Sequence, residues 1–307
     1  MKPVTQQKLT PRAWGLLLLL ALIWGASFLS NRAALAEVGV LTTVAFRVTG
    51  AAVALWAYIG WRRLAVPRGG RALALFLAMG LLNNVIPFTL IVWGQTRVDS
   101  GLAAILNAAT AIFAVVLSAG IFPDERMTAR RALGVMLGFL GVVLAMGPGQ
   151  LVAFDPRSLG QLAILGAALS YAAAAAFARI AARGLGPEVS AAGMLTGAAV
   201  IMVPLSLYVE GTPSLSYGAA TWAALAYLAF AASALAYLLY YAVLQVAGAG
   251  NLSLVTLLIP PIAIALGVTP AIAAPGAAGH GHETFSAGEP GNPKKKSRVV
   301  QVIMREG

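Results

Sequence analysis

The sequence predicts an all-α membrane protein that crosses the bilayer many times. Of its 307 residues, 60% are hydrophobic and only 10% are charged, and the mean hydropathy is +0.84. A soluble domain carries about 25% charged residues, and a soluble core of this size would not hide so much apolar surface. Apolar runs of roughly 20 residues recur along the chain, which is the length that a helix needs to cross ~30 Å of hydrocarbon.

Apolar runs between helix breakers predict nine spans. The first follows a basic start and precedes "ALA" at 34–36, so a cleaved signal peptide is the alternative to an integral helix there. The intervening Asn31 and Arg32 and the length of the run favour the integral helix. The predicted spans are 13–33, 40–61, 72–94, 101–122, 129–147, 159–179, 190–209, 218–242 and 250–268.

Lysine and arginine are distributed unevenly between the connections, and this predicts the orientation. Alternate connections carry only Arg32, Arg97 and Arg157. The N-terminus and the remaining connections carry Lys2, Lys8, Arg12, Arg62, Arg63, Arg68, Arg71, Arg126, Arg130, Arg131, Arg179 and Arg183. Because cytoplasmic loops are enriched in basic residues, we expect the N-terminus to be cytoplasmic and the chain to lie in the inner cell membrane.

Two pairs of segments indicate an internal repeat. "WGASFLSNRAA" at 24–34 aligns with "YAAAAAFARIA" at 171–181 at an offset of 147. "FTLIVWGQTRVDSGLAAILNAATAIFAVVLSA" at 88–119 aligns with "AYLLYYAVLQVAGAGNLSLVTLLIPPIAIALG" at 236–267 at an offset of 148. Five spans separate the equivalents, so the second copy would cross the membrane in the opposite sense. Two inverted five-helix repeats are the prediction, with a substrate site near the midplane between them; chance similarity between Ala/Leu-rich helices is the alternative.

Several motifs appear in a characteristic order. "ALIWGASFLSNRAAL" at 21–35 is followed by "GLAAILNAATAIFAVVLSAGIFPDERMTARRALGVMLGFLGVVLAMGP" at 101–148 and by "AGAGNLSLVTLLIPPIAIALG" at 247–267. In this order, over residues 13–268, the chain resembles the drug/metabolite transporter superfamily and specifically its EamA-type exporters of amino acids and metabolites. The resemblance implies a ten-helix carrier of two bundles, with both termini cytoplasmic and a central cavity.

The sequence departs from that pattern after Val268. The family would supply a tenth helix, but residues 269–307 are rich in Gly, Pro and charge and contain no apolar run near 20 residues. Such a segment is expected to be disordered. We therefore expect a first repeat at 1–148, a second with four recognisable helices at 158–268, and an atypical tail at 269–307. The tenth helix would be missing or replaced, for example by a shifted reading frame.

Polar side chains inside the apolar runs are the first candidates for substrate binding. Asn83 and Asn84 stand side by side in the third span, Asn107 lies in the fourth and Ser170 in the sixth. Consecutive helical positions are about 100° apart, so one amide of the pair can bond to a neighbouring helix while the other lines a cavity. Structural hydrogen bonds between helices are the alternative role.

Arg47 is the clearest charge within a span, and a buried charge is expensive in a bilayer. Three roles are open: snorkelling outward, bonding to helix carbonyls, or binding an anionic substrate group such as a carboxylate.

Aromatic residues complete the candidate set. Trp24 and Tyr171 lie in mid-span and are related by the repeat offset, so they can face each other across a pseudo-twofold axis and line a pocket. Packing between helices is the alternative. Tyr237, in the eighth span, is the remaining candidate.

All ten acidic residues fall in predicted loops, span ends or the tail. Proton-coupled carriers keep a carboxylate or histidine in the membrane as a relay, so we expect facilitated movement. The predicted function is export of small metabolites, with amino acids, aromatic ones among them, or amphipathic drugs as substrates, by alternating access. A carrier of nucleotide sugars or phosphorylated metabolites and a channel-like protein are the alternatives; a single buried Arg argues against the phosphate-binding option.

Other classes of function find little support in the sequence. No catalytic constellation lies within a span, so we expect no enzyme, no cofactor and no metal; His280 and His282 are in the tail. The net charge of +11 is spread over short loops, with "KKKSR" at 294–298 as one basic patch, so no nucleic acid is expected as a partner. The expected partners are a small-molecule substrate and the lipid bilayer, and the sequence leaves a homodimer open.

Overall fold

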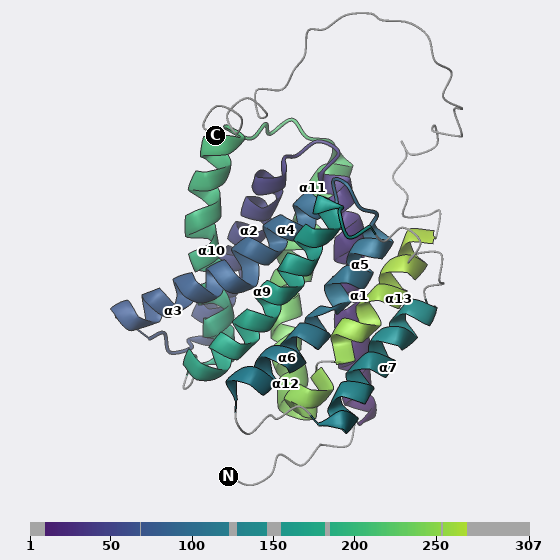
Figure 1. Ribbon diagram of the computed structural model, residues 1–307. Coiled ribbons are helices and arrows are strands. Elements are labelled where there is room, and N and C mark those ends of the chain that lie inside the picture. Colours follow the sequence, from purple (N-terminus) through teal and green to yellow (C-terminus); the bar gives the residue numbers. More distant parts are fainter. Residues whose placement is uncertain are drawn as a thin grey trace, which may run out of the picture. The chain divides into compact units, whose positions relative to one another are not determined.

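The computed structural model of the chain describes residues 10–67, 69–122, 128–145, 155–181, 185–252 and 254–268. Every regular element in these ranges is a helix, and none is a strand (Figure 1). The helices are α1 (Pro11–Ala34), α2 (Val40–Arg62), α3 (Gly70–Gly80), η1 (Leu81–Val85), α4 (Ile86–Gly94), α5 (Ser100–Ala108), α6 (Thr110–Ile121), α7 (Ala129–Ala145), α9 (Leu159–Ala181), α10 (Pro187–Val209), α11 (Ala219–Ala226), η2 (Tyr227–Leu235), α12 (Ala236–Leu252) and α13 (Leu254–Val268).

Seven helical runs in the described ranges are long and apolar enough to cross a membrane. They are residues 11–34, 40–62, 70–94, 100–121, 159–180, 187–209 and 219–247. The prediction of an all-α polytopic membrane protein is confirmed.

The remaining predicted spans coincide with shorter helices, α7 and α13. Most predicted boundaries lie close to the observed ones, but the end predicted at 242 is wrong, since α12 continues to Leu252. The Gly- and Ala-rich end of α12 does not stop the helix, because glycine is better tolerated in membrane helices than in water.

Large apolar side chains cover the outside of the helices. Leu18 and Leu22 on α1 are 48% and 45% exposed, and Val200 on α10 and Leu140 on α7 are 61% and 50% exposed. Apolar surface on this scale is unfavourable in water but matches the hydrocarbon of a bilayer. The exposed side chains therefore face lipid.

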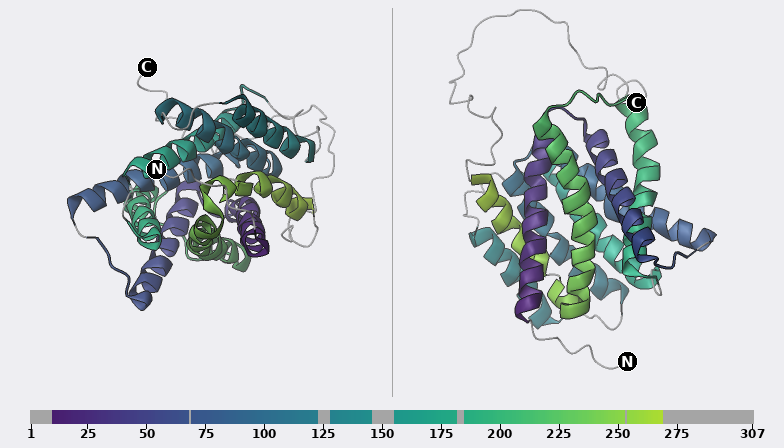
Figure 2. Two further views of the ribbon diagram at one scale, coloured as in Figure 1. Left: turned by 90° about the horizontal axis from the view of Figure 1, so that it is seen from below. Right: turned by 180° about the vertical axis from the view of Figure 1, so that it is seen from behind.

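The core is built by pairs of helices that are distant in sequence. α2 packs along α10, where the Trp56 indole donates to Thr196 Oγ1 over 2.8 Å. α1 runs alongside the continuous helix of α11, η2 and α12, as seen from behind (Figure 2, right), and it also packs against α13. On the other side, α9 packs against α4 and α6. One face of α1 is buried in this core, with Leu17 and Leu20 fully buried.

Two of the spans contain π-helical turns, which were not predicted. η1 precedes Pro87, whose ring nitrogen cannot donate to a carbonyl one turn earlier. Ser170 on α9 donates to the carbonyl of Leu82 within η1 over 2.7 Å. In η2 the Ser233 hydroxyl donates to the Leu228 carbonyl over 2.9 Å. Side chains thus take up backbone groups that π-helical turns leave available in the membrane.

In the predicted fourth span a single turn residue, Ala109, separates α5 from α6, and its backbone remains in the right-handed helical region. The Thr110 hydroxyl donates to the Asn107 carbonyl over 2.7 Å.

The contacts of the chain define one compact unit at residues 1–272, and a second at 273–307 lies wholly outside the described residues. The predicted atypical tail, "KKKSR" at 294–298, His280 and His282 therefore fall outside the described residues.

Candidate functional site

A cavity of about 520 Å³ lies among the helices. Its volume is in the range of small-molecule binding pockets. Residues from all the described spans except α7 contribute to its wall. Of the eight sequence-predicted residues, the cavity is lined by Trp24, Arg47, Asn83, Asn107, Tyr171 and Tyr237, whereas Asn84 and Ser170 are not in its lining.

Asn83 and Asn84 both bond to the hydroxyl of Tyr237 on α12. Asn83 Nδ2 donates to this hydroxyl over 3.0 Å, and the hydroxyl donates to Asn84 Oδ1 over 2.9 Å. Both amides thus bond across to a neighbouring helix, and Asn83 also lines the cavity, whereas Asn84 does not. Both lie in the π-helical turn η1, where the α-helical spacing of about 100° does not apply.

The two amides nevertheless differ in exposure. Asn83 is half-buried and reaches the cavity, and its Nδ2 is also 3.6 Å from the sulfur of Met194. Asn84 is completely buried, and its Nδ2 has no hydrogen-bond partner among the described residues. Asn83 is placed to touch a ligand, while Asn84 fixes Tyr237.

Ser170 was predicted to bind substrate, but it is not in the cavity lining and makes a contact between helices instead. Its hydroxyl points to η1, where it donates to the Leu82 carbonyl. Its neighbour Tyr171 is the residue of α9 that reaches the cavity.

Arg47 is 94% buried, with an exposed fraction of 6%, so the snorkelling role is wrong. Its Nε donates to Ser233 Oγ over 2.9 Å and its Nη2 to the Ala232 carbonyl over 3.4 Å, as the second of the three roles expected. The Cζ atom lies 3.8 Å from the centre of the Phe88 ring, a cation–π contact. These contacts fix the guanidinium in the cavity wall.

Trp24 and Tyr171 line the same cavity, but each packs against a different aromatic ring. Trp24 lies 6.0 Å from Tyr240, and its indole donates to the Ala232 carbonyl over 3.2 Å. Tyr171 lies 6.5 Å from Phe88. The Ala232 carbonyl in η2 therefore accepts hydrogen bonds from both Trp24 and Arg47, so that α1 and α2 are both bonded to the same residue of η2.

The sequence analysis missed Ser233 and Phe88. Tyr240 and Tyr241, which also line the cavity, stood out as aromatic residues in the sequence but were left out of the candidate set. Ser233 is a lone polar residue in an apolar run, which is the same signal that singled out Asn83. Phe88 carried no signal, because a phenylalanine in a membrane helix is unremarkable until Arg47 is seen against its face.

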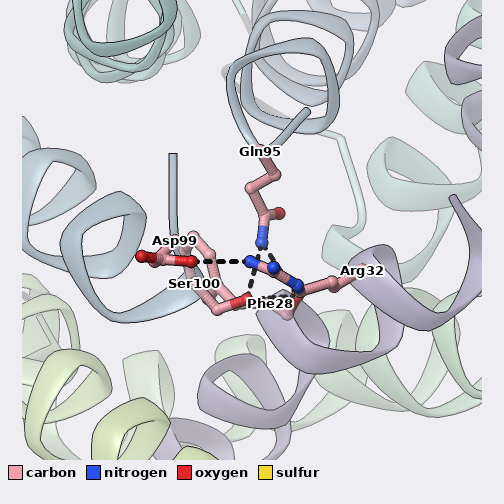
Figure 3. A network of polar contacts seen from close by, with 5 residues as sticks. All are labelled: Phe28, Arg32, Gln95, Asp99 and Ser100. Atoms are coloured by element: carbon pink, nitrogen blue, oxygen red, sulfur yellow. Dashed lines mark hydrogen bonds and ion pairs between the residues drawn. The ribbon is translucent and has the colours of Figure 1, made fainter. Parts of the chain in front are cut away.

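A buried polar network lies beside Phe28 and Asn31 of the cavity wall, and Figure 3 shows its bonds between Phe28, Gln95 and Ser100. Gln95 Nε2 donates to the Phe28 carbonyl over 2.8 Å and to Ser100 Oγ over 3.2 Å, and its Oε1 accepts from Asn31 Nδ2 over 2.9 Å. Asn31, Gln95 and Ser100 are at most 8% exposed. Outside this layer, Arg32 and Asp99 form an exposed ion pair of 2.8 Å.

At one end the cavity wall extends to the ends of the helices. Leu185 and Pro187 at the start of α10 and Leu252 at the end of α12 belong to it, and the first two are partly exposed. The cavity thus reaches one end of the bundle and stops short of the other.

Metal ligands do not gather anywhere in the part of the chain that the structure describes. No group of three or more His, Cys, Asp or Glu side chains is found in these ranges. The polar groups of the described site are amides, hydroxyls and one guanidinium, and aromatic and aliphatic side chains form the rest of the lining.

A helical bundle of membrane-spanning length around a small-molecule cavity is the architecture of a membrane transporter. The sequence profile described as the EamA-like transporter family matches residues 12–147 and 158–269. The chain belongs to this family, and it is a membrane transporter.

Individual relatives agree with this assignment. The chain is 24% identical to the "uncharacterized transporter YoaV" of Bacillus subtilis (strain 168), over 80% of this chain and 84% of that protein. It is 26% identical to "protein PagO" of Salmonella typhimurium, over 82% of each. A "probable terminal-alkyne amino-acid exporter" of Streptantibioticus cattleyicolor is 32% identical over 46% of this chain and 47% of that protein. A crystal structure with 19% identity matches the fold with a TM-score of 0.65, over 87% of this chain and 91% of that chain.

Proposed function

We propose that the protein exports small amphipathic metabolites, a class that includes amino acids, by alternating access through the cavity. The observation that carries this proposal is the asymmetry of the cavity, which reaches one end of the bundle and is closed at the other by Asn31, Gln95 and Ser100. A carrier needs such a closure on one side at a time. A channel would need a path that reaches both ends.

The distribution of basic residues supports an orientation for this state. With the N-terminus cytoplasmic, α10 begins and α12 ends on the cytoplasmic side. The reason is that the first residue of α10 and the last residue of α12 lie on the side of the bundle where α1 starts. The closed end would then face outward. We propose that the structure represents the inward-facing state, in which an exporter of the inner membrane takes up its substrate from the cytoplasm.

The packing of the helices supports the proposed inverted repeats. At an offset near 147, α1 corresponds to α9, α2 to α10 and α4 to α12. α1 packs against α12 and α13, and correspondingly α9 packs against α4 and α6, while α2 and α10 pack against each other. Both third spans contain a π-helical turn, η1 and η2. Such turns are local weak points at which one bundle can bend relative to the other.

The proposal includes no carboxylate relay and no catalytic step. The described acidic residues lie at helix ends or between helices, and none of them is in the described cavity lining. Movement down a substrate gradient is consistent with this lining. The name of the Streptantibioticus cattleyicolor relative supports amino acids as one substrate class.

Cysteine accessibility provides the test, because the chain has no cysteine of its own. In the wild-type background, we expect Ala178→Cys, in the cavity wall near the open end, to react with a membrane-impermeant thiol reagent added from the cytoplasmic side. Ser27→Cys, deep in the wall near Gln95, should not react from the outside. Adding Gln95→Leu removes three hydrogen bonds of about 1 kcal/mol each, so the outward-open population should rise by about tenfold or more.

The expected result is that Gln95→Leu makes Ser27→Cys reactive from outside and slows the labelling of Ala178→Cys. Ala65→Cys, in the exposed loop between α2 and α3, is the matched control and should label equally in both backgrounds. Reactivity of one cysteine from both sides at equal rates would indicate a channel. An unchanged Ser27→Cys in folded Gln95→Leu protein would contradict the role of the closed end.

A further inference from the structure

The charge of Arg47 is not neutralised by any described side chain. The guanidinium is 94% buried, and its two hydrogen-bond acceptors, Ser233 Oγ and the Ala232 carbonyl, are neutral. No described aspartate or glutamate pairs with it, and the described cavity lining contains neither residue type. A buried charge without a counter-ion is strongly unfavourable unless something supplies the opposite charge.

The geometry leaves one edge of this guanidinium free. Nε and Nη2 share the edge that bonds to η2, whereas Nη1 has no hydrogen-bond partner among the described residues. The Phe88 ring covers the flat face of the group at 3.8 Å and is itself held by Tyr171. The N–H groups of the edge between Nη1 and Nη2 therefore remain for a ligand, in the fork arrangement that binds a carboxylate with two parallel hydrogen bonds.

The rest of the lining suits an apolar body. Trp24, Phe76 and Tyr240 contribute aromatic surface, and Met79 and Ile91 contribute aliphatic surface. A ligand with a carboxylate on Arg47 would lay its carbon skeleton against these side chains.

We propose that the cavity selects amphipathic organic anions, which bind with one carboxylate on Arg47 and carry no ammonium group. This inference rests on the proposed function and narrows it: among the small amphipathic metabolites proposed above, the cavity would favour organic anions over amino acids. The ammonium group of an α-amino acid is attached next to the carboxylate and would be held close to the Arg47 charge, with no described carboxylate in the lining to receive it. A cationic amphiphile would meet the same repulsion without the compensating bond.

Neutral acceptors are the one feature that would favour an amino acid. Asn31 and Asn107 belong to the cavity wall, and the Oδ1 atom of each is buried without a partner. An ammonium group that reached these oxygens would make the zwitterion the better ligand. The amino acid is therefore the decisive comparison.

Four ligands on one phenylalkyl skeleton provide the experiment: 3-phenylpropionate, 3-phenylpropionamide, phenylalanine and phenethylamine. Their binding to the purified full-length protein in lipid nanodiscs is measured by calorimetry. We expect the acid to bind at least about tenfold more tightly than its amide, because the carboxylate accepts hydrogen bonds from the guanidinium as a charged group and the amide accepts them only as a neutral one. Phenylalanine should bind more weakly than the acid, and phenethylamine weakest of all.

Arg47→Gln identifies the residue responsible. In this variant the acid and the amide should bind equally, with the affinity for the amide within about twofold of wild type, which also demonstrates an intact cavity. Arg97→Gln, which removes an exposed arginine outside the cavity, is the matched control and should keep the preference for the acid. Equal binding of acid and amide by the wild type, tighter binding of phenylalanine, or no binding of the acid would overturn the proposal.

Transport is measured separately, so that the two proposals can fail independently. Proteoliposomes are tested for counterflow of labelled 3-phenylpropionate and 3-phenylpropionamide. Counterflow of both at equal rates would support a transporter and overturn the anion selectivity. Selective binding of the acid without counterflow would keep the anion site and refute export of this class.

Discussion

Replacing Gly197 by alanine is expected to lower the unfolding temperature of the protein by about 3–10 °C, because overpacking a tight contact costs ~1–3 kcal/mol. A Cβ atom at this position on α10 would meet the carbonyl oxygen of Phe76 and would lie 2.8 Å from its carbonyl carbon. These are backbone atoms of α3, which no side-chain rotation can move. The reciprocal contact is equally close, since a Cβ on Gly80 would lie 2.6 Å from Met194 O and Ala198 N.

The matched control for this prediction is Gly60→Ala near the end of α2, where an added Cβ has no neighbour within 4 Å. Its unfolding temperature should stay unchanged or rise, since alanine favours a helix over glycine. Both variants are compared by thermal unfolding in the same detergent. Equal unfolding temperatures would mean that α3 and α10 separate easily. Transport by Gly197→Ala should also fall, because Phe76 and Met194 at this contact line the cavity.

Removing the hydroxyl of Tyr237 is expected to destabilise the fold by about 1–3 kcal/mol, the penalty of an unsatisfied buried polar group. In Tyr237→Phe, Asn84 Oδ1 loses its donor, and Asn84 Nδ2 has no partner among the described residues already. A completely buried amide is then left without a hydrogen bond. This exceeds the average of about 0.6 kcal/mol measured for single hydrogen bonds between membrane helices.

Two further variants test whether the amide causes this loss. Tyr241→Phe removes a neighbouring hydroxyl that makes no hydrogen bond within the described ranges, and it should leave the free energy of unfolding nearly unchanged. Asn84→Leu combined with Tyr237→Phe should recover most of the stability, because replacing both partners by apolar groups leaves no completely buried amide unsatisfied. Asn83 Nδ2 also loses its acceptor in both variants, but it is only half-buried at the cavity. If the double variant is less stable than Tyr237→Phe, Asn84 has a role beyond its bond to Tyr237.

The π-helical turns show where reasoning from the sequence reaches its limit. The apolar run at 80–95 predicted a helix across the membrane, and a helix is found there as α3, η1 and α4. Pro87 was visible in the sequence, but the consequence for Asn83 and Asn84 was not. Only the π-helical turn brings two adjacent amides to the same hydroxyl on α12. In η2 no proline gives any warning of the turn.

The contacts of Arg47 are a second feature that could not be predicted from the sequence. The unfavourable free energy of burying the Arg47 charge in the bilayer was evident from its position in an apolar run. The need for a hydrogen-bonding or charged partner was evident for the same reason. Which partner it meets depends on η2, a segment more than 180 residues further along the chain. The residue that covers its face, Phe88, becomes significant only through this contact.

The sequence by itself determined the class and the approximate spans, because the bilayer demands about 20 apolar residues for each crossing and soluble domains usually carry about 25% charged residues. It also singled out the polar and aromatic side chains that stand in those spans. The tertiary structure decided which of them share a cavity, because the packing of helices that are distant in sequence determines which face of a helix meets lipid, a neighbouring helix or the cavity. Asn83 and Trp24 thus reach the cavity, whereas Asn84 and Ser170 hold the surrounding helices in place.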